Sequence, residues 1–389
     1  MKRDNRTDDF MPFSRPSIGP EEIREVTECL ASGWITTGPR VQRFEQALAE
    51  YFGAPHVLAV SSATAGLHLA LLTLDLKEGD EVITTPMTFA ATLNTIVLAG
   101  GRPVLADIEP GSLNLDLVKA ERAVTERTRA IVPVHFAGRP LDLDALYAFA
   151  GRHSLRVVED AAQAVGAEFR GRRLGAFGDL QVFSFHPNKN ITTGEGGCVV
   201  TRDAAIAKTI ATLRFHGIDR EAFNRNAKGG SPHYAVVAPG FKYNMMDIQA
   251  ALGIHQLPRL DGFNRRRGAL ADRYHEQLRD WPQWTLPAES PYPYRHAWNL
   301  YTPLINPAAA RMDRDTFMQR MGQAGIGTGL HYQAIHLHPF YAQRFGFRRG
   351  DFPIAETVSD RIVSLPLFPD MTDADQDRVI EVMRRVFDS

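Results

Sequence analysis

Lys189 occupies a position in the sequence that is typical of a reactive amine in a binding site. It follows a short apolar run at 180–185 that predicts a buried strand, and a glycine-rich turn at 194–197 comes after it. In open α/β sheets, binding sites form at the carboxyl ends of the strands. A lysine held beside a sheet loses its proton more easily than one in water, and it can condense with an aldehyde. Without this context, a single lysine is more typical of a solvated surface.

Asp160 ends a second apolar run and is followed by two small residues, Ala161 and Ala162. A carboxylate buried at this position needs a cationic partner. A protonated pyridine nitrogen would supply that partner, and the charged ring could then withdraw electrons from a substrate carbon. The alternative is that Asp160 caps the N-terminus of a helix, as Asp often does. The two roles are compatible.

The segment 61–68 (SSATAGLH) leads from a predicted strand directly into a predicted helix. Small side chains, including those at Thr64 and Ala65, leave the first N–H groups of that helix accessible. The helix dipole favours an anion at the same place, so the segment resembles a phosphate-binding site. Ordinary helix starts have a similar composition, so this signal gains weight only beside Lys189 and Asp160.

A Schiff-base lysine, a carboxylate for a ring nitrogen and a phosphate site are together what pyridoxal phosphate requires. Phe89, which follows the predicted strand at 81–85, adds an aromatic face that would stack on the pyridine ring. The alternative for Phe89 is a place in the hydrophobic core. The combination predicts pyridoxal phosphate as the cofactor.

Alternating strands and helices would position these residues. Apolar residues spaced i, i+3, i+4 predict helices at 65–74, 141–152 and 204–214. This order is typical of an α/β fold with a mostly parallel central sheet and helices on both faces. The predicted strands lie at 56–61, 81–85, 103–106, 130–134, 155–159, 180–185 and 198–201.

The last part of the chain has a different pattern. A long helical run from Asp247 to about Arg279 is interrupted at Pro258, where we expect a kink. A proline-rich stretch at 282–293 precedes a predicted strand at 298–304 and predicted helices at 314–324 and 373–386. We therefore expect a large α/β domain with an N-terminal arm at residues 1–260, and a smaller C-terminal α+β domain at 261–389.

Composition narrows the class of protein. The 389 residues include 44 Lys and Arg against 45 Asp and Glu, a formal net charge of −1. Neither nucleic acid nor an anionic membrane is therefore an expected partner. The charged N-terminal segment lacks the apolar region of a signal peptide, and no apolar run is long enough to span a membrane. We expect a cytoplasmic location.

A nicotinamide-dependent sugar dehydrogenase is the main alternative among enzymes. Such an enzyme would need a G-x-G-x-x-G loop between a strand and a helix, whereas the glycines at 194–197 lead into a strand. The P-loop and G-x-S-x-G motifs are also absent. His331, His336 and His338 match no zinc-binding spacing, and the cysteines Cys29 and Cys198 stand far apart, so no metal site is predicted.

Five motifs give the chain a resemblance to the DegT-type sugar aminotransferases over nearly its full length. They lie at 33–39 (GWITTGP), 62–65 (SATA), 159–163 (EDAAQ), 184–189 (SFHPNK) and 241–251 (FKYNMMDIQAA). These relatives are enzymes dependent on pyridoxal phosphate (PLP) with the aspartate-aminotransferase fold, known as fold type I. The resemblance implies transfer of an amino group from L-glutamate, which leaves as 2-oxoglutarate, to a keto sugar carried by a nucleotide.

The resemblance also implies roles for single residues. Lys189 would form the Schiff base with the cofactor and move the proton, whereas relatives that act as sugar dehydratases have His at this position. Asp160 would pair with the pyridine nitrogen, and Gln163 would lie beside the ring hydroxyl. The resemblance implies that the protein is a homodimer with shared active sites, in which Asn244 reaches the phosphate bound to the neighbouring subunit. Further contacts are implied to phosphate from Thr64, Ala65 and Ser184, and to substrate from His331 and Lys242.

Three stretches resemble most closely the members that form UDP-4-amino-4-deoxy-L-arabinose from a UDP-4-keto-pentose, for lipopolysaccharide or polysaccharide biosynthesis. They lie at 12–16, 325–331 and 364–372. The chain departs from those members at Gln163, where they tend to have His, and at Phe89, where they tend to have Trp. Another UDP- or dTDP-linked keto sugar, such as a 4-keto-6-deoxyhexose, is therefore an alternative substrate. A regulatory relative without turnover is the non-enzymatic alternative, against which Lys189 and Asp160 argue.

Overall fold

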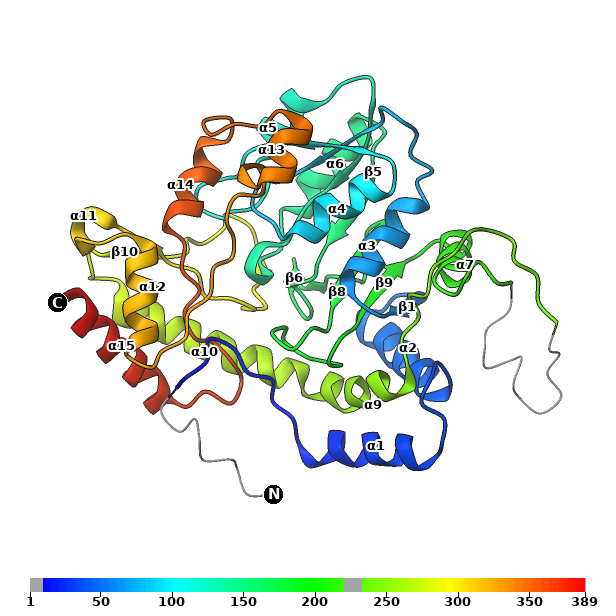
Figure 1. The fold of residues 1–389 in the computed structure, drawn as a ribbon, viewed down its shortest axis with the longest axis horizontal. Helices are drawn as coiled ribbons and strands as arrows, with labels where there is room; N and C mark the ends of the chain where they lie inside the picture. Colours follow the sequence, from blue (N-terminus) through cyan, green and yellow to red (C-terminus); the bar gives the residue numbers. More distant parts are fainter. Residues whose placement is uncertain (1–9, 220–232, 389) are drawn as a thin grey trace.

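Seven strands form the central sheet of the computed structural model, which describes residues 10–219 and 233–388 (Figure 1). Their order is β1-β9-β8-β5-β4-β2-β3, with parallel pairing from β8 to β3 and β9 antiparallel to both β1 and β8. The predicted mostly parallel sheet is confirmed, and each of the seven strands predicted for it lies within two residues of its expected bounds. The strands are β1 (His56–Val60), β2 (Glu81–Thr84), β3 (Arg102–Leu105), β4 (Thr128–Val132), β5 (Arg156–Asp160), β8 (Leu180–Ser184) and β9 (Gly197–Thr201).

Helices cover both faces of this sheet. Leu58 and Val182 pack in one cluster with α3 (Ala63–Leu72), α4 (Ala90–Leu98) and α7 (Ala204–Leu213). Ala59 and Phe183 point to the opposite face and pack in a cluster with α2 (Pro39–Phe52), α5 (Leu117–Ala123) and α6 (Leu143–Arg152). Because side chains alternate between the faces of a strand, burial of both faces requires nearly continuous apolar strands. This requirement explains the unbroken apolar runs in the sequence.

Several helices begin at a polar residue that satisfies their first N–H groups. The carboxylate of Asp116 accepts hydrogen bonds at the start of α5, and Asp142 and Asp203 do the same for α6 and α7. The Ser62 hydroxyl caps α3 in the same way. Such caps stabilise a helix by about 1 kcal/mol each. They fix where the chain turns from each strand into the next helix, and hence where the loops at the sheet edge lie.

The long helical run after the sheet is interrupted at Pro258, as predicted. It consists of α9 (Asp247–Gln256), the short 3-10 helix η3 (Leu257–Arg259) and α10 (Leu260–Leu278). The second half of α10 packs with α12 (Arg314–Gln323) and α15 (Asp373–Asp388) in a separate core that includes Tyr274, Phe317 and Met383. The two predicted helices of this region are confirmed. The domain boundary between residues 260 and 261 stays a prediction.

The predicted strand at 298–304 is wrong for most of its length. Only β12 (Leu304–Ile305) is extended in a ladder, where it pairs with β10 (Trp284–Thr285). Trp298 has a positive φ of 48°, and the N–H groups of Asn299 and Leu300 donate to Ala137 O, in the large sheet-containing part of the chain. Leu300 is thus buried against the loop that follows β4, while Tyr301 and Trp298 pack in the C-terminal core.

The C-terminal elements also pack against the large part of the chain. The carboxylate of Asp107, just after β3, accepts hydrogen bonds from the N–H groups of Ile354 and Ala355 at the start of α14. No helix in the described ranges is both long and apolar enough to cross a membrane. The remaining elements are α1 (Pro20–Ala31), η2 (Phe136–Gly138), β6 (Glu168–Phe169), β7 (Arg172–Arg173), β11 (Tyr294–Arg295), α11 (Pro307–Ala310), η4 (Ile335–Leu337), α13 (Pro339–Phe345) and α14 (Pro353–Arg361).

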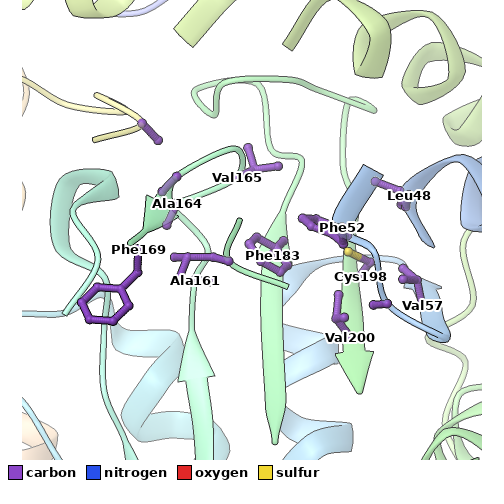
Figure 2. Close-up of a cluster of buried hydrophobic side chains, with 14 of the residues drawn as sticks. Leu48, Phe52, Val57, Ala161, Ala164, Val165, Phe169, Phe183, Cys198 and Val200 are labelled. Atoms are coloured by element: carbon purple, nitrogen blue, oxygen red, sulfur yellow. The ribbon is translucent and has the colours of Figure 1, made fainter. Parts of the chain in front are cut away.

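Figure 2 shows the core on the α2 face of the sheet. Phe183 from β8 lies beside Cys198 and Val200 from β9, and Phe52 of α2 lies over them. The rings of Phe52 and Phe183 stack with their centroids 4.6 Å apart. Because Phe183 is fully buried one residue before the end of β8, this core also supports the loop that carries Lys189.

We expect Phe183→Ala to lower the free energy of unfolding by about 3–5 kcal/mol, because it leaves a cavity in a closely packed core. Denaturation in urea, followed by circular dichroism, measures the change. Phe340→Ala removes the same atoms from a side chain that is 55% exposed, so it should change the free energy by no more than about 0.5 kcal/mol. Equal losses for the two variants would contradict the packing argument.

Candidate active site

A cavity of about 470 Å³ opens at the carboxyl edge of the sheet, between the ends of β5 and β8 and the start of α3. This is where open α/β sheets place their ligands. The cavity brings together seven of the ten predicted site residues, from segments far apart in the sequence. They are Thr64, Phe89, Asp160, Gln163, Ser184, Lys189 and His331.

Lys189 reaches the cavity from the turn that follows β8. Its N–H donates to His186 O at 2.8 Å, which closes the turn and directs the side chain inward. Burial lowers the pKa of the Lys189 amine to about 8, against the opposing effect of the Asp160 carboxylate. A substantial fraction of the amine is therefore neutral near pH 8, as a nucleophilic amine requires.

Asp160 ends β5 inside the same cavity and is 6% exposed. The Thr92 hydroxyl, from α4, donates to Asp160 Oδ2 at 2.7 Å, and the Ala162 N–H donates to Oδ1 at 3.2 Å. Thr88 Oγ1 lies 2.7 Å from Thr92 Oγ1 and extends this hydroxyl chain. Burial raises the pKa of Asp160, while these hydrogen bonds and the nearby Lys189 oppose the rise.

The start of α3 forms one wall of the cavity. Ser62 Oγ accepts the Ala65 N–H at 3.1 Å, and Ala63 and Thr64 line the cavity beside it. Gly197 must lack a side chain here, because a Cβ would lie 2.7 Å from the Ala63 nitrogen. Ala65 itself does not line the cavity in this chain, since its N–H is already bonded. Its contact with phosphate stays a prediction.

Gln163 is held at both ends of its amide. The Ala137 N–H donates to Gln163 Oε1, and Gln163 Nε2 donates to the Tyr332 hydroxyl, both at 2.6 Å. Phe89 lies near Tyr332, with ring centroids 6.1 Å apart, and is 61% exposed. The alternative that Phe89 belongs to the hydrophobic core is therefore wrong. Its open face is available for stacking.

Besides Ala65, two of the predicted residues lie outside the cavity lining. Asn244 is buried next to the end of β1, where its Nδ2 donates to Thr37 Oγ1 and its Oδ1 has no partner among the described residues. Lys242 is exposed, with Nζ 4.3 Å from the centroid of the Phe215 ring. Within a single chain, neither residue contacts the cavity, so their roles stay predictions.

The histidines at 331, 336 and 338 do not converge. His331 lines the cavity, its Nδ1 lies 2.8 Å from Ser364 Oγ, and burial together with the charge of Lys189 lowers its pKa to about 4. His336 is buried elsewhere and pairs with Glu356 at 3.0 Å. Across the part of the chain that the structure describes, no group of three His, Cys, Asp or Glu side chains is arranged to hold a metal ion.

Sequence reasoning missed Thr92 and Tyr332. Thr92 lies in an apolar helix and belongs to none of the motifs. The one sequence feature that could have indicated it is its spacing of four residues from Thr88, which directly precedes Phe89. Tyr332 directly follows His331, which the sequence did indicate. Two titratable groups at the cavity mouth, His186 and Glu195, were also missed, and they lie 4.0 Å apart.

The residues present fit pyridoxal phosphate. Within residues 10–219 and 233–388, neither Lys189 nor Asp160 forms a salt bridge, although Asp160 is buried and Lys189 is partly buried against the same cavity. An aldehyde for the amine and a cationic ring nitrogen for the carboxylate would complete both groups. The Ser184 hydroxyl and the start of α3 are placed to hold the phosphate, and Phe89 to cover a face of the ring.

The fold and this cavity define a PLP-dependent enzyme of fold type I, the class of its structural neighbours. The profile of one family matches residues 16–384. The chain belongs to this family, the DegT/DnrJ/EryC1/StrS aminotransferases. The predicted family, fold class and cofactor are thereby confirmed.

Relatives cover almost the whole chain. The spore coat polysaccharide biosynthesis protein SpsC of Bacillus subtilis is 46% identical over 378 residues, which are 97% of each protein. The PLP form of Spr1654 from Streptococcus pneumoniae, described as a sugar aminotransferase, is 31% identical with a TM-score of 0.89, covering 97% of this chain and 99% of that one. PseC of Helicobacter pylori, an aminotransferase involved in the biosynthesis of pseudoaminic acid, is 29% identical with a TM-score of 0.89, covering 98% and 99%. The chain is a sugar aminotransferase of this family.

The carboxylate of Asp160 should raise the pKa of Lys189, because a nearby negative charge stabilises the ammonium form. We therefore expect Asp160→Asn to lower that pKa below the value of about 8 by roughly one unit. The pH dependence of Lys189 labelling by an amine-directed reagent, in protein stripped of cofactor, gives the pKa. Glu195→Gln, at the exposed mouth of the cavity, is the control and should change it little. An unchanged or higher midpoint in Asp160→Asn would refute the coupling.

We expect Thr92→Val to weaken binding of pyridoxal phosphate roughly 10- to 100-fold, because a hydrogen bond to a charged group contributes ~1.5–3 kcal/mol. Titration of cofactor-free protein, followed by fluorescence, measures the affinity. Thr95→Val is a matched control, since the buried Thr95 hydroxyl donates only to carbonyls of its own helix, Ala91 O and Thr92 O. If both variants lost the same affinity, the contact with Asp160 would not be the cause.

Proposed function

We propose that this enzyme transfers the amino group of L-glutamate to the keto group of a nucleotide-linked sugar. The observation that supports the proposal most is the pair formed by Lys189 and Asp160. Asp160 is buried and Lys189 is partly buried, both face one cavity, and neither has an ion-pair partner within the described ranges. Such an arrangement is costly for stability and is typical of catalytic sites.

Bound pyridoxal phosphate supplies an aldehyde that condenses with amines and a ring that withdraws electrons from the adjacent carbon. Asp160 would keep the ring nitrogen protonated. The Thr92 hydroxyl and the Ala162 N–H fix the orientation of its carboxylate. Lys189, with a pKa of about 8, can accept a proton from the carbon that bears the donor amine in the first half of the reaction, and deliver a proton to the sugar carbon in the second half. The donor leaves as 2-oxoglutarate before the sugar enters, which gives a ping-pong mechanism.

A UDP-4-keto-pentose, aminated to UDP-4-amino-4-deoxy-L-arabinose, is the first candidate substrate. The stretches at 12–16, 325–331 and 364–372 support it, and the last two provide His331, which lines the cavity, and Ser364, which lies within hydrogen-bond distance of His331. The second candidate is a UDP- or dTDP-linked 4-keto-6-deoxyhexose. The departures at Gln163 and Phe89, both at the cavity, favour this second candidate.

A homodimer with shared active sites is part of the proposal. Ile35 and Met246 are large apolar side chains that are 48% and 42% exposed, on segments joined by a hydrogen bond from the Ile248 N–H to Ile35 O. Exposed apolar patches of this kind mark interaction surfaces. Asn244 lies close by in sequence, and its unpartnered Oδ1 supports a contact with a group beyond its own chain. Lys242 would then serve the substrate from the same segment.

We expect the purified protein to aminate one or more members of a panel of UDP- and dTDP-linked 4-keto pentoses and hexoses with L-glutamate. Mass spectrometry of the amino sugar measures the product. Lys189→Ala should fold but give no detectable turnover, because no other amine in the described lining can replace it. Lys208→Ala, which removes an exposed lysine from α7, is the control and should retain full activity.

Two results would overturn the proposal. One is full activity of Lys189→Ala. The other is a protein in which borohydride attaches the cofactor to Lys189 but no keto sugar of the panel is aminated, which would favour the regulatory alternative.

A further inference from the structure

The turn that carries Lys189 is bonded on both sides to the last third of the chain. Just before the lysine, the Asn299 side chain donates from Nδ2 to Asn188 O at 2.9 Å. Just after it, Asn190 Nδ2 donates to Asn264 Oδ1 and to Ala297 O, each at 2.6 Å. The turn is therefore held before Lys189 through the backbone carbonyl of Asn188 and after it through the side chain of Asn190, by groups that lie more than 70 residues away in sequence.

The partners of the turn are themselves fixed. Asn264 lies on α10 and donates from Nδ2 to Val165 O at 3.1 Å. About one helical turn later on the same helix, Arg267 is 1% exposed. One of its guanidinium nitrogens donates to the carbonyls of Trp298, Asn299 and Leu367, at 3.4, 3.3 and 2.9 Å. Its charge is thus used to hold the segment that bears Asn299.

These amides are placed where water cannot replace them. Asn190, Asn264 and Asn299 are 2%, 6% and 2% exposed. A buried carbonyl that loses its donor has no alternative partner, so each bond resists displacement of the backbone it holds. We name the three residues the lysine clamp.

We propose that the lysine clamp positions the amine of Lys189, so that residues of the C-terminal part of the chain control its reactivity. This inference rests on the proposed function, which makes Lys189 the residue that bonds to the cofactor. Asn190, Asn264 and Asn299 are positioning residues, since none of them lines the cavity.

The chemistry explains why such a clamp is needed. In a transamination, the amine of the donor would release the Lys189 amine in the first half, and Lys189 would have to return to the same place, displacing the amine of the product, at the end of the second half. A backbone fixed on both sides of the lysine limits where the freed amine can move, and it keeps the amine in the buried setting beside Asp160. Displacements of about 1 Å in a catalytic group can cost about a hundredfold in rate.

The test uses protein stripped of cofactor, so that it does not depend on any sugar substrate. Competitive labelling with fluorodinitrobenzene over a range of pH, with mass spectrometry of the peptide that contains Lys189, gives the midpoint for that amine. In Asn299→Leu and Asn264→Leu we expect the midpoint to rise from about 8 by roughly one unit, because a loosened turn admits water. In the reloaded variants, kcat should fall about tenfold or more, with little change in the KM for glutamate.

Asn114→Leu is the matched control. Asn114 is also 2% exposed and holds a loop by bonds to backbone, with Nδ2 3.4 Å from the carbonyls of Arg139 and Pro140 and Oδ1 accepting the Phe136 N–H. This variant should lose a similar amount of thermal stability without moving the Lys189 midpoint. Asn299→Ser replaces Asn299→Leu if the latter does not fold. Because serine supplies a hydroxyl donor in place of the amide, this variant should raise the Lys189 midpoint by less than Asn299→Leu.

The outcomes separate the two proposals. A midpoint shift in the clamp variants and not in Asn114→Leu supports the clamp. No shift in any variant, or the same shift in the control, overturns it, even if the parent protein is an active aminotransferase. A parent protein that aminates no keto sugar contradicts the proposed function, while the labelling midpoints still decide whether the clamp controls the amine.

Discussion

The burial of two opposite charges around one cavity is the constraint on which the rest of this structure depends. Asp160 is buried and Lys189 is partly buried, and this burial lowers the pKa of the amine and raises the pKa of the carboxyl group. Neither group is neutralised by a salt bridge within the described part of the chain. The fold must therefore supply enough packing and hydrogen bonding elsewhere to tolerate them, as catalytic sites generally require.

The sheet supplies much of that support. β5 and β8 are parallel neighbours, so Asp160 and the turn bearing Lys189 emerge at the same edge, with helices packed over both faces behind them. The start of α3 meets this edge closely enough that only glycine fits at Gly197. The phosphate end, the ring nitrogen and the aldehyde of one cofactor can thus be reached from the segments at the ends of β1, β5 and β8.

The C-terminal part of the chain completes the site. The Tyr332 hydroxyl accepts a hydrogen bond from the side-chain amide of Gln163, which is expected to lie beside the cofactor ring. The Asn299 side chain donates to the turn that carries Lys189. The stretch at 298–300 gives its own backbone bonds to Ala137, which is why it does not form the expected strand. The smaller part of the chain is therefore bonded to the reactive residues themselves, and its packing affects how they are held.

The sequence alone determined the order of strands and helices, because burial of both sheet faces requires apolar runs and helix starts require capping residues. It also indicated Lys189 and Asp160, since residues that end parallel strands must meet at one edge. It did not reveal Thr92 beside Asp160, Tyr332 beside Gln163 or Asn299 beside Asn188, contacts that span 68, 169 and 111 residues. Local sequence patterns do not predict such pairs, because only the packing of distant segments decides which polar groups lie together in the interior.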